Sequence, residues 1–473
     1  MTVDPPHRHV DTRDVQAILD DFLKSVDVPG VAVSLFTSKG VTVRAARGVS
    51  SIESPDTAMT PTTVGVVHSL SKVMTGTAAG VLVARGHADI DEPITRHLPD
   101  VPGRDRFAHT TLRHLLSHSA GIVRGPVPLL SEATWRDPLE QYVLGACLGA
   151  PRFAEPGQVF GYSELGIVVA GYVIQRIMRK PFVQAMRELL FEPAGMRRTT
   201  LDPFAAMTFP LCQQHVATPS GRLAVRRRFD ANLMTAPSSG AFSCVEDLAR
   251  LGVVHLGGDP GNRGRPLLTA TAARQLHEPC VDVGLDIVRG YGMAIAIGPR
   301  YGNALSVGHE GHYDGNWSKL QLIPDLGIGA AWLDNRGEDP ALRPRRQKYF
   351  DQLLHLLGAG RRSWLRDNGL GSTPDLAVAA EAAVAAGIYG RPAGRTITIS
   401  AEANGLRVTD GVASVRYTHL AGHVYVAPTG APNHIPWAPD PDSTRSTLSI
   451  VGSAQTPTHV LLNGLPYQRL GQH

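Results

Sequence analysis

The sequence is short of lysine and cysteine. Only six of its 46 basic residues are lysine, and its 473 residues include four cysteines. Cys147, Cys212, Cys244 and Cys280 stand too far apart for any pair to have metal-ligand spacing. We expect free, buried thiols rather than a disulfide framework or a metal site. Nothing else in the sequence points to a cofactor.

Long apolar runs and strong charge are also missing. No run reaches the ~20 apolar residues that a transmembrane helix needs, and the segment from Met1 to Leu23 lacks the pattern of a secretion signal. The net charge is +4, and the longest basic run is Arg226–Arg228, which we interpret as a solvated patch. These absences argue against membrane and nucleic-acid partners. They predict a cytoplasmic protein that acts on a small molecule or a peptide.

The length of the chain predicts two domains. Residues 12–360 show a helix, a hairpin, helical patterns over about 100–285, several β-type runs and a closing helix. This order favours an α/β (α+β) fold, with an antiparallel sheet flanked by helices and an all-helical insertion. Residues 361–378 are typical of a linker. Residues 379–473 contain short β-type runs between turn residues, which predicts a second, small all-β domain.

Ser69 and Lys72 form a Ser-x-x-Lys motif where a β-type run gives way to a helical pattern. At this spacing both side chains share one face of a helix. The helix N-terminus stabilises negative charge developing at the serine, and a buried lysine that loses its proton serves as its base. The alternative is a helix cap followed by an exposed lysine. The apolar flanks and the rarity of lysine favour catalysis.

Two further stretches carry residues suited to chemistry. A Pro-Gly turn delivers Tyr162 and Glu164 just before a helical pattern. A tyrosine transfers protons when a cation lowers its pKa, but a core tyrosine at a loop corner is the alternative. The second stretch is a glycine-rich strand, which lets backbone approach a ligand closely. It contains His309 and His312, which a strand places on opposite faces, so we do not expect a metal there.

Together and in this order, the motifs resemble the serine β-lactamase and penicillin-binding-protein superfamily, in its class C branch. That branch includes class C β-lactamases, D-alanyl-D-alanine carboxypeptidases, D-aminopeptidases and carboxylesterases. The likeness runs from Val28 to about Asn335 and includes residues 111–121 and Tyr291. It implies a β-lactamase-like/transpeptidase fold and a covalent acyl-enzyme, and it says little about the substrate.

The resemblance also implies roles for individual residues. Ser69 matches the acylated nucleophile, Lys72 the lysine of its proton network, and Tyr162 the general base. The strand motif, which ends at Gly311, should supply one oxyanion N–H, from His312. The other comes from the backbone of the nucleophile itself.

Two departures from the family pattern affect the substrate and the base. His309 replaces the lysine of β-lactamases and is largely neutral near pH 7, which argues against an efficient β-lactamase. Glu164 replaces an asparagine, and an ionised glutamate only accepts hydrogen bonds. If it faces Lys72, it favours the charged ammonium and shifts general-base duty to Tyr162 or to itself. The alternative is that Glu164 turns outward and caps the next helix.

The C-terminal segment resembles the lipocalin-like barrel that follows the catalytic domain in penicillin-binding-protein-type thioesterases and related hydrolases. Tyr389-Gly390 and the stretch from Pro466 to Arg469 are the matching landmarks. Such barrels often cover the active site. Arg469 is therefore a candidate ligand for a substrate carboxylate, with a structural arginine as the alternative.

Three functions remain open at this point. The first is a serine hydrolase that acts on a peptide, amide or ester. The second is an acyltransferase or peptide macrocyclase of natural-product biosynthesis, with a thioester or carrier-protein-linked substrate. The third is a catalytically impaired binding protein. The combination of Ser69, Lys72 and Tyr162 argues against the third, and Glu164 keeps it open.

Overall fold

We describe the protein from a computed structural model. The structure describes residues 9–123, 137–229, 232–281, 290–313, 315–337, 339, 341–363, 384–390, 396–402, 405–410, 414–421, 424–426, 447–453, 456–462 and 465–471. None of the helices within these residues is both long enough and apolar enough to cross a membrane.

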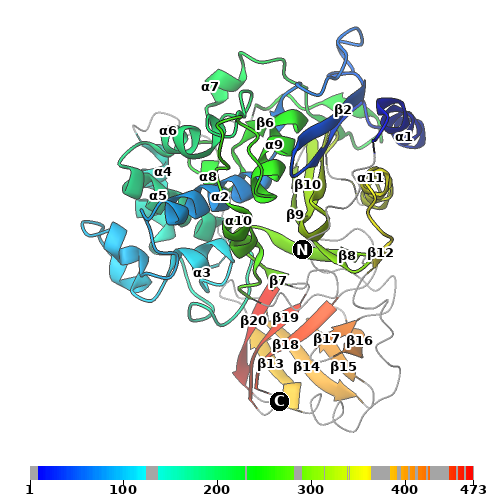
Figure 1. Ribbon diagram of the computed structural model, residues 1–473. Helices are drawn as coiled ribbons and strands as arrows, with labels where there is room; N and C mark the ends of the chain where they lie inside the picture. The colour runs from blue at the N-terminus through cyan, green and yellow to red at the C-terminus, as the bar shows by residue number, and fades with distance from the viewer. Residues whose placement is uncertain are drawn as a thin grey trace.

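An antiparallel sheet forms the centre of the larger part of the molecule (Figure 1). Its strands are β1 (Gly30–Thr37), β2 (Gly40–Gly48), β7 (Gly290–Tyr291), β8 (Ala296–Tyr301), β9 (Ala304–Tyr313), β10 (Asn316–Ile323), β11 (Ile328–Asp334) and β12 (Arg362–Ser363). Their order is β12-β8-β9-β10-β11-β1-β2, and β7 pairs with β8. Strands β1, β10 and β11 are buried along their whole length, because helices cover both faces of the sheet.

Each face of the sheet has its own apolar core. On one face, α1 (Thr12–Ser25) and α11 (Arg343–Leu356) pack together. Val15, Leu19 and Phe22 of α1 recur at helical spacing and are buried there. Phe22 meets Trp332 edge to face at 4.9 Å. The other face is covered by α9 (Val245–His255) and by α2 (Leu70–Ala84), which follows the predicted nucleophile and contacts β9 and β10 directly.

The region predicted to be all-helical contains several helices joined by irregular segments, and it also contains strands. Besides α9, its α-helices and the one that precedes it are α2 (Leu70–Ala84), α3 (Leu112–Leu116), α4 (Pro138–Tyr142), α5 (Glu164–Met178), α6 (Phe182–Met186), α7 (Pro203–Ala206), α8 (Ala236–Ser239) and α10 (Ala270–His277). A hairpin joins β4 (His215–Ala217) to β5 (Leu223–Val225), and β6 (Phe242–Ser243) pairs with β3 (Gly65–Val66). These strands are too short to leave a period-2 pattern in the sequence.

The C-terminal part of the chain is a closed antiparallel barrel, shown in orange and red in Figure 1. Its strands are β13 (Gly387–Gly390), β14 (Thr396–Glu402), β15 (Gly405–Thr409), β16 (Ser414–Ala421), β17 (Val424–Val426), β18 (Thr447–Ser453), β19 (Thr456–Leu462) and β20 (Leu465–Gly471). The all-β expectation is confirmed, whereas the likeness to lipocalins stays a prediction. Of the predicted linker, residues 362–363 join the main sheet as β12, and residues 364–378 lie outside the described residues.

Candidate active site

Ser69 stands at the junction of β3 and α2. The residue before it, His68, has a left-handed backbone with φ of 46°, an unusual conformation that often accompanies functional sites. Ser69 is the N-cap residue of α2, yet its side chain makes no capping hydrogen bond. The helix-cap interpretation of this serine is therefore wrong, because its hydroxyl is directed to other partners.

Lys72 is fully buried, and its ammonium has three kinds of acceptor around it. Nζ donates to Ser69 Oγ at 2.9 Å and to the carbonyl oxygen of Ser238 at 2.8 Å. It also lies 3.1 and 2.9 Å from the two carboxylate oxygens of Glu164. An ammonium has three N–H donors, so these acceptors satisfy it completely. The alternative of an exposed lysine is wrong.

The charge state of Lys72 follows from this environment. Burial disfavours the charged ammonium, but chiefly the Glu164 carboxylate overcomes that cost and raises the pKa of Lys72 above its ordinary value. Glu164 begins α5, where Ser163 provides the side-chain cap by accepting from the N–H of Gly166. Glu164 thus faces the lysine, and the outward-turned alternative does not hold.

Tyr162 completes the surroundings of the serine. Its hydroxyl donates to Ser69 Oγ at 3.2 Å, and Lys72 Nζ lies 5.0 Å from the centre of its ring. Burial raises the pKa of Tyr162 above its ordinary value, although the lysine works in the opposite direction. A cation does act to lower the pKa of this phenol, but burial outweighs it, and the hydroxyl is protonated at neutral pH.

Strand β9 brings the third motif to the serine. A side chain at Gly311 would place Cβ 2.0 Å from the carbonyl oxygen of Val67, so only glycine permits this approach. His309 faces the same side, with its ring centre 6.2 Å from that of Tyr162. His312 faces the opposite side, where its Nε2 lies 2.9 Å from a guanidinium nitrogen of Arg343. The alternation of the strand separates the two histidines, as expected.

His309 is uncharged at neutral pH. Burial and, after it, the charge of Lys72 lower the pKa of His309 to about 4. Its Nδ1 lies 2.5 Å from the carbonyl oxygen of Glu310, which assigns the ring proton to Nδ1. Nε2 is then left with a lone pair. Next to Ser69, this position accordingly offers a neutral acceptor in place of a cation.

The motif-based assignment gave no role to two residues behind Tyr162, His118 and Tyr291. The ring of His118 stacks on that of Tyr162 at 4.3 Å, and its Nδ1 accepts the backbone N–H of Ser163 at 3.1 Å. The hydroxyl of Tyr291 is buried and has no hydrogen-bond partner among the described residues. Both lie in stretches whose likeness to the family is visible in the sequence, which is the signal that points to them.

The C-terminal barrel contacts the residues around Tyr162. Leu461 of β19 joins a buried apolar cluster with Tyr162, Phe160 and Tyr291, and a Cβ on Gly161 would meet Pro466 of β20 at 3.1 Å. His459 Nε2 lies 2.8 Å from the carbonyl oxygen of Phe153. These contacts bring the barrel against the wall that holds Tyr162.

The structure does not bring Arg469 together with the other predicted site residues. Its guanidinium donates to the backbone carbonyl oxygen of Ala386 at 2.9 Å. It shares a face of β20 with Tyr467, which is buried in the barrel core. This placement favours the alternative of a structural arginine.

An antiparallel sheet flanked by helices, with a serine and a buried lysine at the start of a helix beside a glycine strand, defines the β-lactamase/transpeptidase class of folds. Residues 15–354 match the beta-lactamase family, and the chain belongs to that family.

Curated relatives agree with this assignment. Penicillin-binding protein 4 of Amycolatopsis lactamdurans is 27% identical over 319 residues, which cover 66% of this chain and 81% of the relative. Protein flp of Staphylococcus aureus strain MW2 is 23% identical over half of this chain, and the match spans about half of its own length (47%).

Solved structures extend the likeness in fold beyond the sheet. A structure of SurE with D-Leu has a TM-score of 0.73 at 22% identity, covering 97% of this chain and 99% of that one. An octameric penicillin-binding protein homologue from Pyrococcus abyssi, at 19% identity, has a TM-score of 0.61 over 97% of this chain and 99% of its own. The D-amino acid amidase of Ochrobactrum anthropi matches 74% of this chain and 99% of its own, with a TM-score of 0.60 at 23% identity. The first two likenesses include the barrel.

Proposed function

We propose that the protein is a serine hydrolase that forms a covalent acyl-enzyme on Ser69 from a peptide, amide or ester. The observation that carries the proposal is that Ser69 Oγ lies at hydrogen-bond distance from both Lys72 Nζ and the Tyr162 hydroxyl oxygen. A nucleophilic serine needs a partner that takes its proton, and a structural serine at a helix start would cap the helix instead.

The charge states favour a proton relay through Tyr162. When Ser69 Oγ bonds to the acyl carbon, its proton passes to the Tyr162 oxygen, while the phenol proton of Tyr162 passes to the leaving group. No net charge moves, and Lys72 stays an ammonium that holds Oγ in place. The backbone N–H groups of Ser69 and His312 receive the oxyanion. Water or an amine then attacks the ester carbonyl by the same steps in reverse.

A second candidate is acyl transfer to an amine, as in a peptide macrocyclase. It is supported by the apolar cluster beside Tyr162, to which the barrel contributes Leu461. A wall of this kind disfavours water as the acceptor of the acyl group. The acyl donor would then be a thioester or another activated peptide, and the acceptor its own amine.

A labelling experiment tests the main proposal. Intact mass after exposure to a fluorophosphonate or a p-nitrophenyl ester should show one adduct, which Ser69→Ala abolishes and the neighbouring Ser71→Ala retains. No adduct under any condition would favour the binding protein of the same fold. With a peptidyl thioester, the ratio of cyclised to hydrolysed product decides between the two acceptors, and Leu461→Ser should lower that ratio if the apolar wall excludes water.

A further inference from the structure

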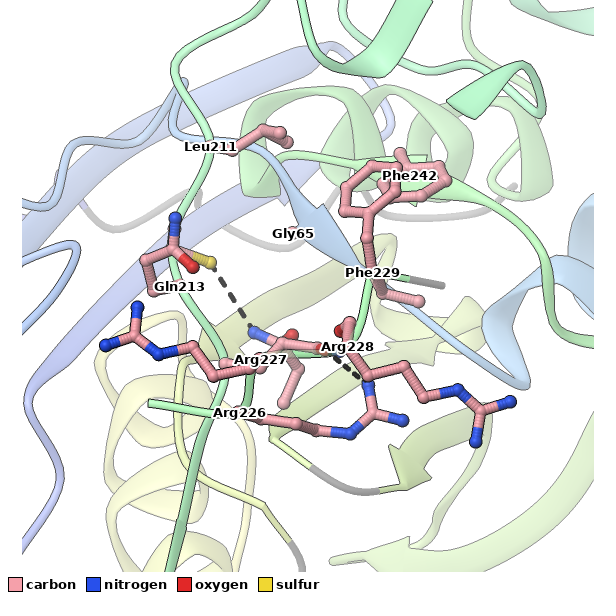
Figure 2. Close-up of a pocket in the computed structure, with 12 residues that line it drawn as sticks. Gly65, Leu211, Gln213, Arg226, Arg227, Arg228, Phe229 and Phe242 are labelled. Carbon is pink, nitrogen blue, oxygen red and sulfur yellow. Dashed lines mark hydrogen bonds between the residues drawn. The ribbon is translucent and has the colours of Figure 1, made fainter. Parts of the chain in front are cut away.

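A pocket of about 190 Å³ lies beside β3, the short strand that precedes Ser69 in the sequence (Figure 2). Figure 2 shows arginine side chains from residues 226–228 on one side of the pocket and the rings of Phe229 and Phe242 on the other. The two rings are stacked, with their centres 5.4 Å apart. One wall is therefore cationic and the opposite wall aromatic.

Two exposed arginines of the cationic wall, Arg227 and Arg228, carry more positive charge than the carboxylates of the described residues neutralise. Arg227 pairs with Glu53 at 2.6 Å, and both side chains are largely exposed, so water screens this pair and it contributes little. Arg228 is exposed and has no carboxylate at ion-pair distance among the described residues. Arg227 and Arg228 thus face one carboxylate among the residues that the structure describes.

The wall is also held in shape. A guanidinium nitrogen of Arg226 donates to the side-chain oxygen of Gln214 at 2.6 Å and to the backbone oxygen of Arg228 at 3.3 Å. Gln214 in turn packs against Gly315, where a Cβ would come within 2.2 Å of it. The basic run is exposed at Arg227 and Arg228, as expected of a solvated patch, but it is held in place at Arg226 and lines a concavity.

We propose that this pocket binds an organic phosphate, with the phosphate on the arginines and an apolar or aromatic part of the ligand against Phe229 and Phe242. Guanidinium groups match the oxygens of a phosphate in pairs, and an aromatic pair provides an apolar face that inorganic phosphate does not use. This site is separate from the chemistry of Ser69 and goes beyond the proposed function.

Calorimetric titration of the full-length Ser69→Ala protein tests the site without turnover. Phenyl phosphate should bind more tightly than inorganic phosphate, which lacks the aromatic contact, and than benzoate, which carries a smaller charge. Arg228→Gln should weaken the binding of phenyl phosphate about tenfold, since it removes one charged hydrogen-bonding partner. Arg222→Gln is the matched control, because Arg222 is exposed in the turn before β5, shortly before residues 226–228, and does not line the pocket.

Phe229→Leu gives an independent reading of the aromatic wall. It should weaken phenyl phosphate and leave inorganic phosphate within twofold of the parent protein. Equal affinities in Arg228→Gln and Arg222→Gln, or no heat with phenyl phosphate at millimolar concentrations, would overturn the proposal. Fluorophosphonate labelling of an otherwise unchanged Arg228→Gln protein reports separately on Ser69, so failure of the pocket leaves the catalytic proposal untouched.

Discussion

The two sides of strand β9 each hold a buried lysine paired with a glutamate, and only one of them faces the candidate nucleophile. On the site side, Lys72 Nζ lies 2.9 Å from Glu164 and donates to Ser69 Oγ. On the other side, Lys319 Nζ lies 2.8 Å from Glu310 and donates to the Gln347 amide oxygen. Burial and pairing are therefore common to a site and to a structural contact, and the third partner of the lysine distinguishes them.

Replacement of the two lysines should separate these roles most clearly. Lys72→Met should slow fluorophosphonate labelling of Ser69 by a factor of about 10³ or more, because the hydroxyl loses the group that holds it. Lys319→Met should label within about threefold of the parent protein. Lys319→Met leaves the buried carboxylate of Glu310 without its cation, so the free energy of unfolding of this variant should fall by about 3–5 kcal/mol.

Urea denaturation measured beside the labelling rate provides the control for this pair of variants. A folded Lys319→Met protein with as little labelling as Lys72→Met would contradict the distinction between the two sides of β9.

The glutamates should differ in their effect on the pH dependence of catalysis. Glu164 raises the pKa of Lys72, so Glu164→Gln should let the ammonium lose its proton at lower pH. If the charged form is the working one, the alkaline limb of kcat/KM moves to lower pH by about one unit or more. Glu310→Gln should leave that limb in place.

The opposite result has an equally clear meaning. A gain of activity near neutral pH in Glu164→Gln would assign the base to neutral Lys72 and reject the relay through Tyr162. The control combines each glutamate variant with Ser69→Ala. Loss of all activity in these double variants excludes a second nucleophile as the source of a change in the pH profile.

The sequence predicted the site side of β9 better than the other side. Ser69, Lys72 and Tyr162 lie within short motifs whose spacing and order are visible in one dimension. The orientation of Glu164 was open, because its rotamer depends on whether Lys72 is buried, which is a property of the packed helices. The Lys319–Glu310 pair carries no motif, and register alone brings the two residues opposite each other.

The barrel likewise shows that local sequence patterns predict single strands but not the pairing of distant ones. Its central strands alternate apolar and polar residues and were predicted. The sequence marks β13 and β20 only by the short stretches Tyr389-Gly390 and Pro466–Arg469, because β13 spans four residues and β20 contains a proline. Closure of the barrel depends on their pairing with each other, a contact between residues some 80 positions apart, which local periodicity does not encode.

The neutral histidine on the site side should make the fold sensitive to acid. The pKa of His309 is about 4 in the folded protein and about 6.5 when unfolded, so the unfolded chain binds the proton first. Stability attributable to this group is therefore full above about pH 6.5 and falls as the pH drops toward 4, by at most about 3 kcal/mol.

His309→Asn should flatten the dependence of the urea midpoint on pH between about 4 and 6.5. Lys72, Tyr162 and Tyr291 face the same ring, and the asparagine leaves them in place. An unchanged slope in His309→Asn would show that the imidazole reaches solvent or carries its proton in the folded state.

The smallest expected effect concerns His118, which lies behind Tyr162, and it extends the comparison from lysines to histidines. His118 touches no reacting atom, but it stacks on Tyr162 and accepts the N–H of Ser163. His118→Leu should lower kcat about tenfold with little change in KM, because the phenol loses its support and the N–H its acceptor. His118→Asn, whose side-chain oxygen accepts the same N–H, should recover part of the loss.

A buried histidine remote from the serine provides the matched comparison. His277 stacks on His255 at 5.2 Å, and the two rings share a hydrogen bond of 2.9 Å. His277→Leu should lower the free energy of unfolding by about 1–3 kcal/mol and leave kcat within twofold. If His118→Leu and His277→Leu lower the free energy of unfolding equally and both leave kcat unchanged, His118 is an ordinary core residue. Tyr162 is then held in place by other residues of its apolar cluster.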